Sequence, residues 1–197
     1  MRWRLTVALM LVVSLRPADA RADWLITPFF GNSFAPETTV LVFEEGAGRK
    51  TTFGGSVALL TDTLFGVEAD FGHTPGFFEG SDPRGLVLTS RVTTLTGNVI
   101  VAAPLALTRE SLRPYFVTGV GLLQARSTHI GGLFPVDRDL YGLDIGGGAV
   151  GFLTRRTGVR FDLRRFKALS GEDGPLARPG VSRLSFWRAS VGLTLAY

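Results

Sequence analysis

Histidine, hydroxyl and carboxylate side chains that could act together in catalysis are sparse in this sequence. There are two histidines, His73 and His129. Asp70 lies three residues before the first, and Ser127 lies two residues before the second. A histidine beside a hydroxyl and a carboxylate could activate a nucleophile for acyl transfer, but neither histidine has both partners nearby in the sequence. We interpret both as solvated residues of long loops and predict no catalytic residue.

Charged residues at every second position form the other candidate site. Arg160, Asp162 and Arg164 alternate with apolar residues, as do Glu68 and Asp70. Such a cluster suits a catalytic or ion-selective site, or a set of mutual salt bridges in a narrow interior. The near balance of opposite charges favours salt bridges with a structural role. The predicted network has seven members: Glu68, Asp70, Asp144, Arg160, Asp162, Arg164 and Arg188.

The sequence predicts no cofactor and no metal site. It contains no cysteine, which excludes thiolate ligands and a disulfide framework. The remaining His, Asp and Glu residues lack the spacing of a metal site. Gly146 to Gly148 form a glycine run, but no helix or lysine follows it, so a phosphate-binding loop is not supported.

Residues 1–22 have the layout of a cleaved secretory signal peptide. A basic start precedes the apolar run from Leu5 to Leu15, whose 11 residues are too few to span a bilayer. Small-residue patterns place the cut after Ala20 or Ala22. The segment carries four arginines and one aspartate, so its removal lowers the net charge from +4 to +1. The mature chain, residues 23–197, is predicted to be one domain that does not bind nucleic acid.

The mature chain has the pattern of β-strands. The full sequence contains 25 glycines and 15 phenylalanines, and apolar residues recur at every second position rather than at helical spacing. Pro28 suggests a bulge or an irregular edge in the first strand. Residues 115–124 are apolar on both faces and cannot be oriented. Eight strands are predicted, centred on residues 24–31, 53–60, 65–72, 90–103, 115–124, 141–146, 159–164 and 186–197.

The segments between these strands alternate in length. Long connections are expected at 32–52, 73–88, 126–139 and 168–183, and shorter ones at 61–64, 104–114 and 154–157. Antiparallel strands joined in this way form an up-and-down β-barrel. Outer-membrane barrels combine short periplasmic turns with longer external loops, so both termini are expected on the periplasmic side.

Two kinds of exported barrel fit this pattern, and they differ in which face is apolar. A soluble lipocalin-like carrier has an apolar interior, whereas a membrane barrel has an apolar exterior. We favour the transmembrane barrel because the polar face carries charges of both signs. In addition, Trp187 and Tyr197 flank an apolar stripe in the last strand, as in an aromatic girdle. Arg91 and Arg165 occupy alternate strand positions that face lipid elsewhere in their strands, so they are expected at the external rim of the barrel.

The end of the chain resembles the insertion signal of bacterial outer-membrane proteins, in which a polar residue and a glycine precede a hydrophobic residue and a final aromatic one. The matching residues are Ser190, Gly192, Leu195 and Tyr197. Further local motifs are similar to the OmpA-like outer-membrane β-barrel domain family: Trp24-x-x-x-Pro28, and Arg113-Pro114-Tyr115 followed by Gly119-Val120-Gly121. The resemblance spans the mature chain. It implies a small stand-alone barrel that the barrel-assembly machinery inserts into the outer membrane.

An enzymatic alternative follows from the same resemblance, because some small outer-membrane barrels modify lipid A. The deacylases among them carry a His-x-Ser-Asn pattern, which the sequences after His73 and His129 lack. We therefore predict a monomeric, non-enzymatic outer-membrane barrel with a structural or surface-interaction role in its external loops. A lipid-modifying enzyme and a soluble periplasmic carrier are the alternatives, and the passage of ions or solutes is left open.

Overall fold

Eight β-strands account for nearly all of the chain that the computed structural model describes, which is residues 22–38, 48–61, 64–78, 87–104, 108, 112–129, 136–154, 156–169 and 184–197. The strands are β1 (Ala22–Thr38), β2 (Lys50–Thr61), β3 (Phe65–Pro75), β4 (Val87–Ala102), β5 (Leu112–His129), β6 (Val136–Phe152), β7 (Thr157–Ala168) and β8 (Leu184–Ala196). Within these ranges no helix is long and apolar enough to cross a membrane.

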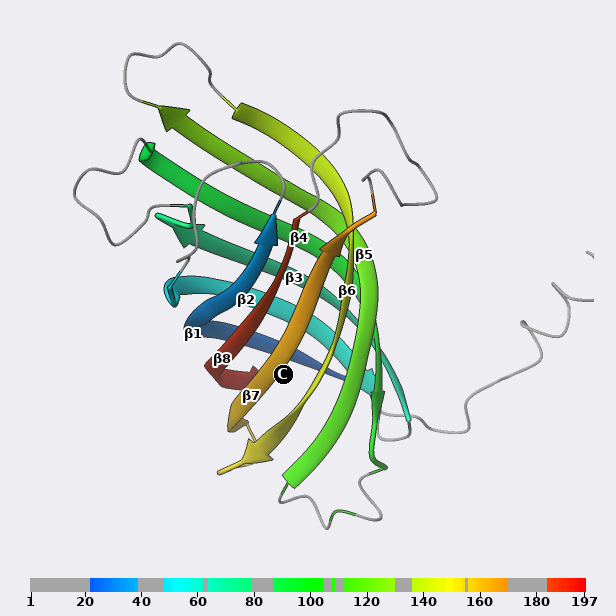
Figure 1. Cartoon of the computed structure of the whole chain (residues 1–197). Coiled ribbons are helices and arrows are strands. Elements are labelled where there is room, and N and C mark those ends of the chain that lie inside the picture. Colours follow the sequence, from blue (N-terminus) through cyan, green and yellow to red (C-terminus); the bar gives the residue numbers. More distant parts are fainter. Residues whose placement is uncertain are drawn as a thin grey trace, which may run out of the picture.

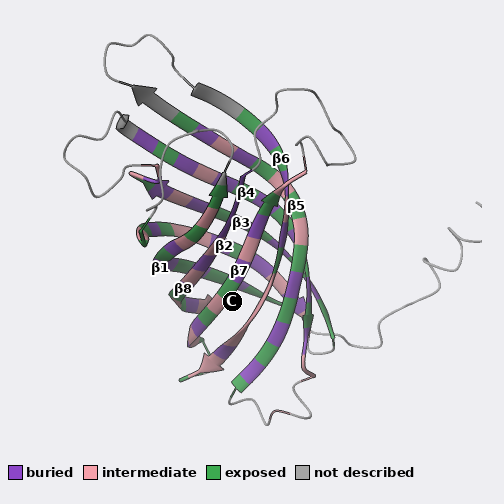
Figure 2. Ribbon diagram, in the orientation of Figure 1, coloured by how far each residue is buried: buried purple, intermediate pink, exposed green. Residues whose placement is uncertain are grey.

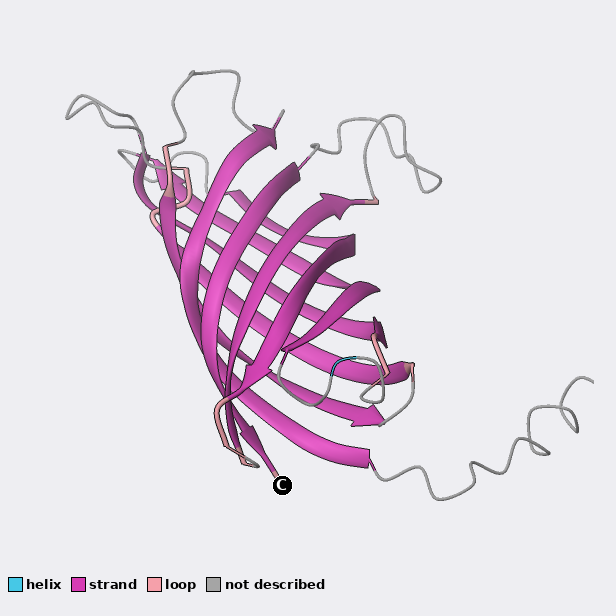
Figure 3. Ribbon diagram, turned by 90° about the horizontal axis from the view of Figure 1, so that it is seen from below, coloured by secondary structure: helices cyan, strands magenta, loops and turns pink. Residues whose placement is uncertain are grey.

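The strands form a closed antiparallel barrel in sequence order, with β8 returning to pair with β1 (Figures 1 and 3). The seam ends in two backbone hydrogen bonds: Trp24 N donates to Tyr197 O at 3.2 Å, and Tyr197 N donates to Trp24 O at 3.0 Å. Closure removes free sheet edges, which is what allows β-structure to reside in hydrocarbon. The predicted fold class is confirmed.

Burial alternates along each strand, as the stripes in Figure 2 show. In β3, Phe65 and Val67 are about 60% and 56% exposed, whereas Glu68 and Asp70 on the other face are at most 4% exposed. The barrel therefore places large apolar side chains outside and charged ones inside. This arrangement is the reverse of a soluble barrel and suits an apolar solvent.

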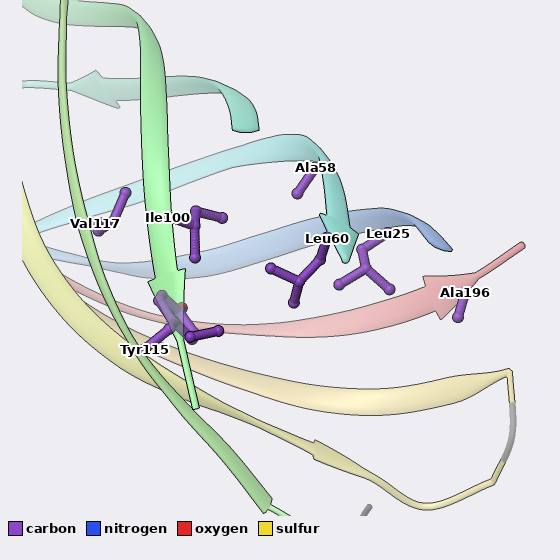
Figure 4. Close-up of a cluster of buried hydrophobic side chains, with 8 residues drawn as sticks. Leu25, Ala58, Leu60, Ile100, Tyr115, Val117 and Ala196 are labelled. Carbon is purple, nitrogen blue, oxygen red and sulfur yellow. The ribbon is translucent and has the colours of Figure 1, made fainter. Parts of the chain in front are cut away.

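The interior contains an apolar cluster near each end of the barrel. One lies at the end that holds the termini and comprises Leu25, Ala58, Leu60, Ile100, Ala102, Tyr115, Val117 and Ala196 (Figure 4). The other lies at the opposite end and comprises Phe77, Val92, Leu123, Ala125, Leu140, Phe166, Leu184 and Phe186. These two clusters explain why residues 115–124 are apolar on both faces, since Val117 and Leu123 point inward while Phe116 and Leu122 point outward.

The strands are longer than the alternating pattern predicts, mainly at the end opposite the termini. β1 continues to Thr38 and β5 to His129, because hydrogen-bonded pairing persists after the apolar alternation stops. The strict alternation of connection lengths is also wrong. Residues 130–135 between β5 and β6 form a shorter connection than residues 103–111 between β4 and β5.

The bulge expected at Pro28 lies elsewhere in β1. Pro28 pairs in register with Gly55 of β2, and the β1–β8 register is the same on both sides of it. The register shifts instead between Phe34 and Glu37, where Ala35 has a positive φ of 48°. A non-glycine residue in this left-handed region accommodates the extra residue of a bulge.

Candidate functional site

All seven residues of the predicted charge network lie in the barrel interior, between the two apolar clusters. They project from four strands: Glu68 and Asp70 from β3, Asp144 from β6, Arg160, Asp162 and Arg164 from β7, and Arg188 from β8. Their side chains are at most 8% exposed. The period-two alternation of each strand brings these charges to one face, and closure of the barrel turns that face inward.

Arg164 is the centre of this layer and has no solvent exposure. Its Nη1 lies 2.8 Å from Glu68 Oε1 and 3.1 Å from Asp144 Oδ2, and its Nη2 lies 2.8 Å from Asp162 Oδ1. β7 and β3 are on opposite walls of the ring, so the contact with Glu68 crosses the lumen. One guanidinium thus links three strands through charge-assisted hydrogen bonds.

Arg160 forms a second bridge across the lumen. Its Nη2 lies 2.6 Å from Glu68 Oε2, and its Nε lies 2.9 Å from Asp162 Oδ2. The hydroxyl of Tyr115 donates to Asp162 Oδ1 at 2.5 Å, and the Arg160 guanidinium lies 4.7 Å from the centre of the Tyr115 ring. Asn98 Nδ2 donates to Glu68 Oε1 at 3.0 Å. These contacts satisfy groups that would be costly to bury alone.

Arg188 is held between a carboxylate and two aromatic rings. Its Nη2 lies 2.8 Å from Asp70 Oδ2, and its guanidinium carbon lies 4.5 Å from the Phe29 ring centre and 4.9 Å from that of Phe166. Its Nε and Nη1 meet no hydrogen-bond acceptor in the described part of the chain. The ring faces supply a cation–π environment in place of those acceptors.

Two contributors to this layer, and one further buried arginine, were not assigned to the lumen from the sequence. Tyr115 and Asn98 bind the network directly, as described above. Arg113 is buried nearer the termini and donates to the carbonyl oxygens of Ala103 and Thr61, both at 2.7 Å. The only sequence signal for Asn98 was that it shares alternate positions with Thr94 and Thr96. Tyr115 begins the segment that could not be oriented, and Arg113 lies in the connection expected at 104–114.

The contacts within the charge layer limit the chemistry that its side chains could perform. Each of the four carboxylates has an arginine within ion-pair distance, and no described group of His, Cys, Asp or Glu side chains could hold a metal ion. General acid or base catalysis needs a carboxyl or imidazole group that can reach a substrate. The arrangement instead joins opposite walls of the barrel.

The histidines lie in strands rather than in the loops predicted for them. His73 is on the outer face of β3, where its Nδ1 lies 2.9 Å from Thr93 Oγ1. Asp70 points into the lumen and so lies on the other side of the barrel wall. His129 is the last residue of β5, and its side chain is outside the described residues. The pairing of β3 with β4 and of β4 with β5 continues past the apolar pattern, which is why these positions are extended.

The four residues that resemble an insertion signal lie on both faces of β8 and just beyond it. Ser190 faces the lumen, and Gly192 packs against β1, where a Cβ would lie 2.6 Å from the Pro28 carbonyl oxygen. Leu195 is half-buried on the outside, and Tyr197 is 75% exposed. Their recognition by assembly machinery is a prediction from sequence. Arg91 and Arg165 both lie on the outer face, towards the end opposite the termini.

Tyr115 is accommodated by a glycine on the next strand. A Cβ on Gly148 would lie 2.5 Å from the Tyr115 hydroxyl oxygen and would also meet the Phe161 carbonyl oxygen. Gly148→Ala is expected to destabilise the barrel by about 1–3 kcal/mol, because both the β7 backbone at Phe161 and the Tyr115 ring must move. Gly97→Ala is the control, since a Cβ there meets nothing within 4 Å. Denaturant midpoints of the two variants, measured in the same lipid vesicles, test this; equal midpoints would contradict it.

Comparison with known proteins supports the fold. No family model and no curated protein matches the sequence. Among solved structures, Neisserial surface protein A aligns with a TM-score of 0.60 and 10% identity over 90% of this chain and 99% of that one. The N-terminal β-barrel domain of Pseudomonas aeruginosa OprF aligns with a TM-score of 0.53 and 18% identity over 91% and 100%.

A third similar structure is Ail, the attachment invasion locus protein of Yersinia pestis, with a TM-score of 0.52 and 11% identity over 89% of this chain and 98% of that one. All three alignments cover nearly the whole of both chains. The resemblance to small eight-stranded outer-membrane barrels is therefore confirmed for the fold. At these identities, function has to be argued from the residues of this chain.

Proposed function

We propose that this chain is a non-enzymatic outer-membrane barrel whose interior is a structural plug and whose biological role lies in the connections opposite the termini. The observation that carries the proposal is the inverted distribution of polarity, with apolar side chains outside and ion pairs inside. A surface of this kind is stable in hydrocarbon and prone to aggregation in water.

Several exposed side chains fit a bilayer that surrounds the barrel. Trp24 and Tyr197, at the end with the termini, are 53% and 75% exposed and have the amphipathic rings that favour a membrane interface. Phe161, Leu163 and Leu193 are about half exposed near the middle of the wall. In a soluble carrier these residues would contact water, whereas a membrane barrel presents them to lipid.

The filled interior argues against a carrier and against a pore. Eight strands enclose a space just wide enough for side chains. Here ion pairs occupy the middle, and an apolar cluster lies towards each end. A carrier needs an empty apolar cavity for its ligand, and a pore needs a continuous polar path.

The biogenesis and orientation of the barrel are part of the same proposal. Residues 1–21 lie outside the described part of the chain, and β1 begins at Ala22. A cut after Ala20 or Ala22 would therefore leave β1 essentially intact. We expect periplasmic termini, insertion by the barrel-assembly machinery through the final strand, and a monomer. The four connections at the other end would face outward and contact surface partners.

Fractionation of the cell envelope, followed by amino-terminal sequencing of the protein, tests the location and the cleavage. We expect the protein in the outer-membrane fraction, with a mature terminus at Arg21 or Asp23. The folded form should migrate differently from the boiled form during electrophoresis. A protein that is monodisperse in detergent-free buffer would contradict the proposal.

The plugged interior predicts that the purified barrel does not conduct. In planar bilayers we expect no stable channel openings, because ions would have to displace buried salt bridges and pass both apolar clusters. A porin reconstituted in the same bilayers is the positive control. Stable unitary conductance from this protein would contradict the plug while leaving the membrane location intact.

A further inference from the structure

The lumenal charge layer contains more carboxylates than guanidinium groups. Its seven members are four acidic residues and three arginines, so the layer has a formal charge of −1 when every group is ionised. Arg113, the remaining buried arginine of the described residues, lies nearer the termini and donates to backbone carbonyl oxygens. An uncompensated charge is costly in a dry interior, so the layer calls for one further positive charge.

Asp144 is the carboxylate with the smallest share of the arginines. Its side chain has no solvent exposure, and it lies 3.1 Å from Nη1 of Arg164. The same nitrogen lies closer to Glu68, at 2.8 Å, and 3.7 Å from Asp70. Asp70 has Arg188 in addition, at 2.8 Å. Because Nη1 of Arg164 carries only two hydrogens for three carboxylates, the excess negative charge falls on Asp144.

Two buried oxygens beside Gly119 of β5 have no hydrogen-bond partner within the described residues. They are Oδ1 of Asp144 on β6 and Oδ1 of Asn98 on β4. Both residues pair in register with Gly119, so they flank it in the lumen. Asn98 Nδ2 donates to Glu68 at 3.0 Å, which fixes the orientation of the amide. Its Oδ1 lies over Gly119, where a Cβ would overlap it.

A single proton would satisfy both oxygens and the charge. Asp144 protonated on Oδ1 can donate to Asn98 Oδ1, and its Oδ2 still accepts from Arg164. The formal charge of the layer then becomes zero. A divalent metal ion does not fit, because Ca²⁺ and Mg²⁺ require about six or more oxygens, and no described group of His, Cys, Asp or Glu side chains could hold a metal ion.

We infer that the charge layer binds one proton between Asp144 and Asn98, at pH values where a free aspartic acid is ionised. The charged groups that face this site are Arg164 of β7 and Glu68 and Asp70 of β3, with Arg188 of β8 beyond Asp70. The folded barrel therefore holds a proton that the unfolded chain releases. The inference rests on the plugged interior of the proposed function, because open water would hydrate the carboxylate instead.

Infrared spectroscopy of the folded protein in lipid vesicles tests the inference at about pH 5, where a free aspartic acid is mostly ionised. We expect the carbonyl stretch of a protonated carboxylic acid, which shifts in heavy water and is missing from Asp144→Asn. Asn98→Leu removes the acceptor and should raise the frequency of this band. A band that is absent from the unaltered protein, or that neither variant changes, would overturn the site.

The stability of Asp144→Asn gives an independent measure. Asparagine resembles a protonated aspartic acid, so the equilibrium constant of unfolding should change by no more than about fivefold, the effect of one neutral hydrogen bond. Asp162→Asn is the matched control, because Asp162 binds both Arg160 and Arg164. It should raise the same constant by about a hundredfold or more. Equal losses in the two variants would mean that Asp144 is ionised, and would overturn the proton.

The pH and the cation of the buffer separate a proton from other sources of positive charge. Raising the pH from about 5 should destabilise the unaltered protein relative to Asp144→Asn, because the folded barrel holds a proton that the unfolded chain lacks. Identical pH dependence in both proteins would contradict the site. Replacing sodium with tetramethylammonium should leave the unfolding midpoint unchanged, and a marked loss would assign the site to sodium instead.

Heat-modifiable mobility checks the folding of each variant and reports the membrane barrel itself. If the unaltered protein shows no such mobility shift and does not insert into vesicles, the proposed function fails. If it inserts but shows no protonated carboxyl group, only the proton site fails.

Discussion

Replacing Arg164 with methionine is expected to destabilise the folded barrel by about 3–5 kcal/mol, the cost of leaving buried charges without a partner. Arg164 has no solvent exposure and lies within 3.1 Å of Glu68, Asp144 and Asp162. Methionine retains much of the volume but none of the charge, so the carboxylates repel one another in a dry interior. Unfolding by guanidinium in lipid vesicles, followed by tryptophan fluorescence, measures the change.

Lys167→Met is the control for Arg164→Met. Lys167 lies on the same strand but is exposed on the outer face, so its replacement should change the stability by no more than about 0.5 kcal/mol. Arg164→Lys should fall between the two, because it keeps the charge but not the two-armed geometry. If Arg164→Met unfolds at the same guanidinium concentration as the control, the charge layer does not hold the walls together.

Replacing Leu163 with arginine is expected to cost about 2–4 kcal/mol in a bilayer, the range for a charge on the lipid face near the membrane centre. Leu163 lies between two members of the charge layer on β7, but its side chain is 47% exposed on the outside. If the barrel were soluble, the same change would be nearly neutral, because an exposed arginine is well solvated. The variant therefore distinguishes the two environments.

Thr51→Arg provides the comparison for Leu163→Arg. Thr51 is exposed on the outer face of β2, close to the end opposite the termini, where a charge costs about 0–1 kcal/mol. Both variants are unfolded in the same vesicles, so that lipid composition cancels. Similar midpoints for the two would mean that no hydrocarbon surrounds the middle of the wall.

The architecture was predictable because alternation is strong wherever one face meets an apolar phase and the other does not. Trp187, Val191 and Leu193 point outward, while Arg188 and Ser190 point inward. The alternation weakens where the two faces of a strand meet surroundings of similar polarity. Residues 32–37 lie beyond the apolar part of the wall and are mixed on both faces, so the extension of β1 could not be read from periodicity.

The membership of the charge layer was predictable, but its pairing was not. The alternation of polar and apolar residues assigns Glu68 and Arg164 to the polar face of their respective strands. Their contact at 2.8 Å depends on barrel closure and on the stagger between β3 and β7, which share no register. Tyr115 was missed because its segment faces an apolar lumen on one side and an apolar exterior on the other, so neither parity stands out.

The ion pairs between β3 and β7 or β8 also bear on the order of assembly. A growing sheet that has not yet curled keeps these strands apart, and their charged side chains are then hydrated. Only when the first and last strands meet do the opposing walls come within reach, and the water is expelled. The ion pairs across the lumen therefore form late in assembly. A sheet that has not closed can still unfold strand by strand, whereas the closed barrel must break several ion pairs at once before it reopens.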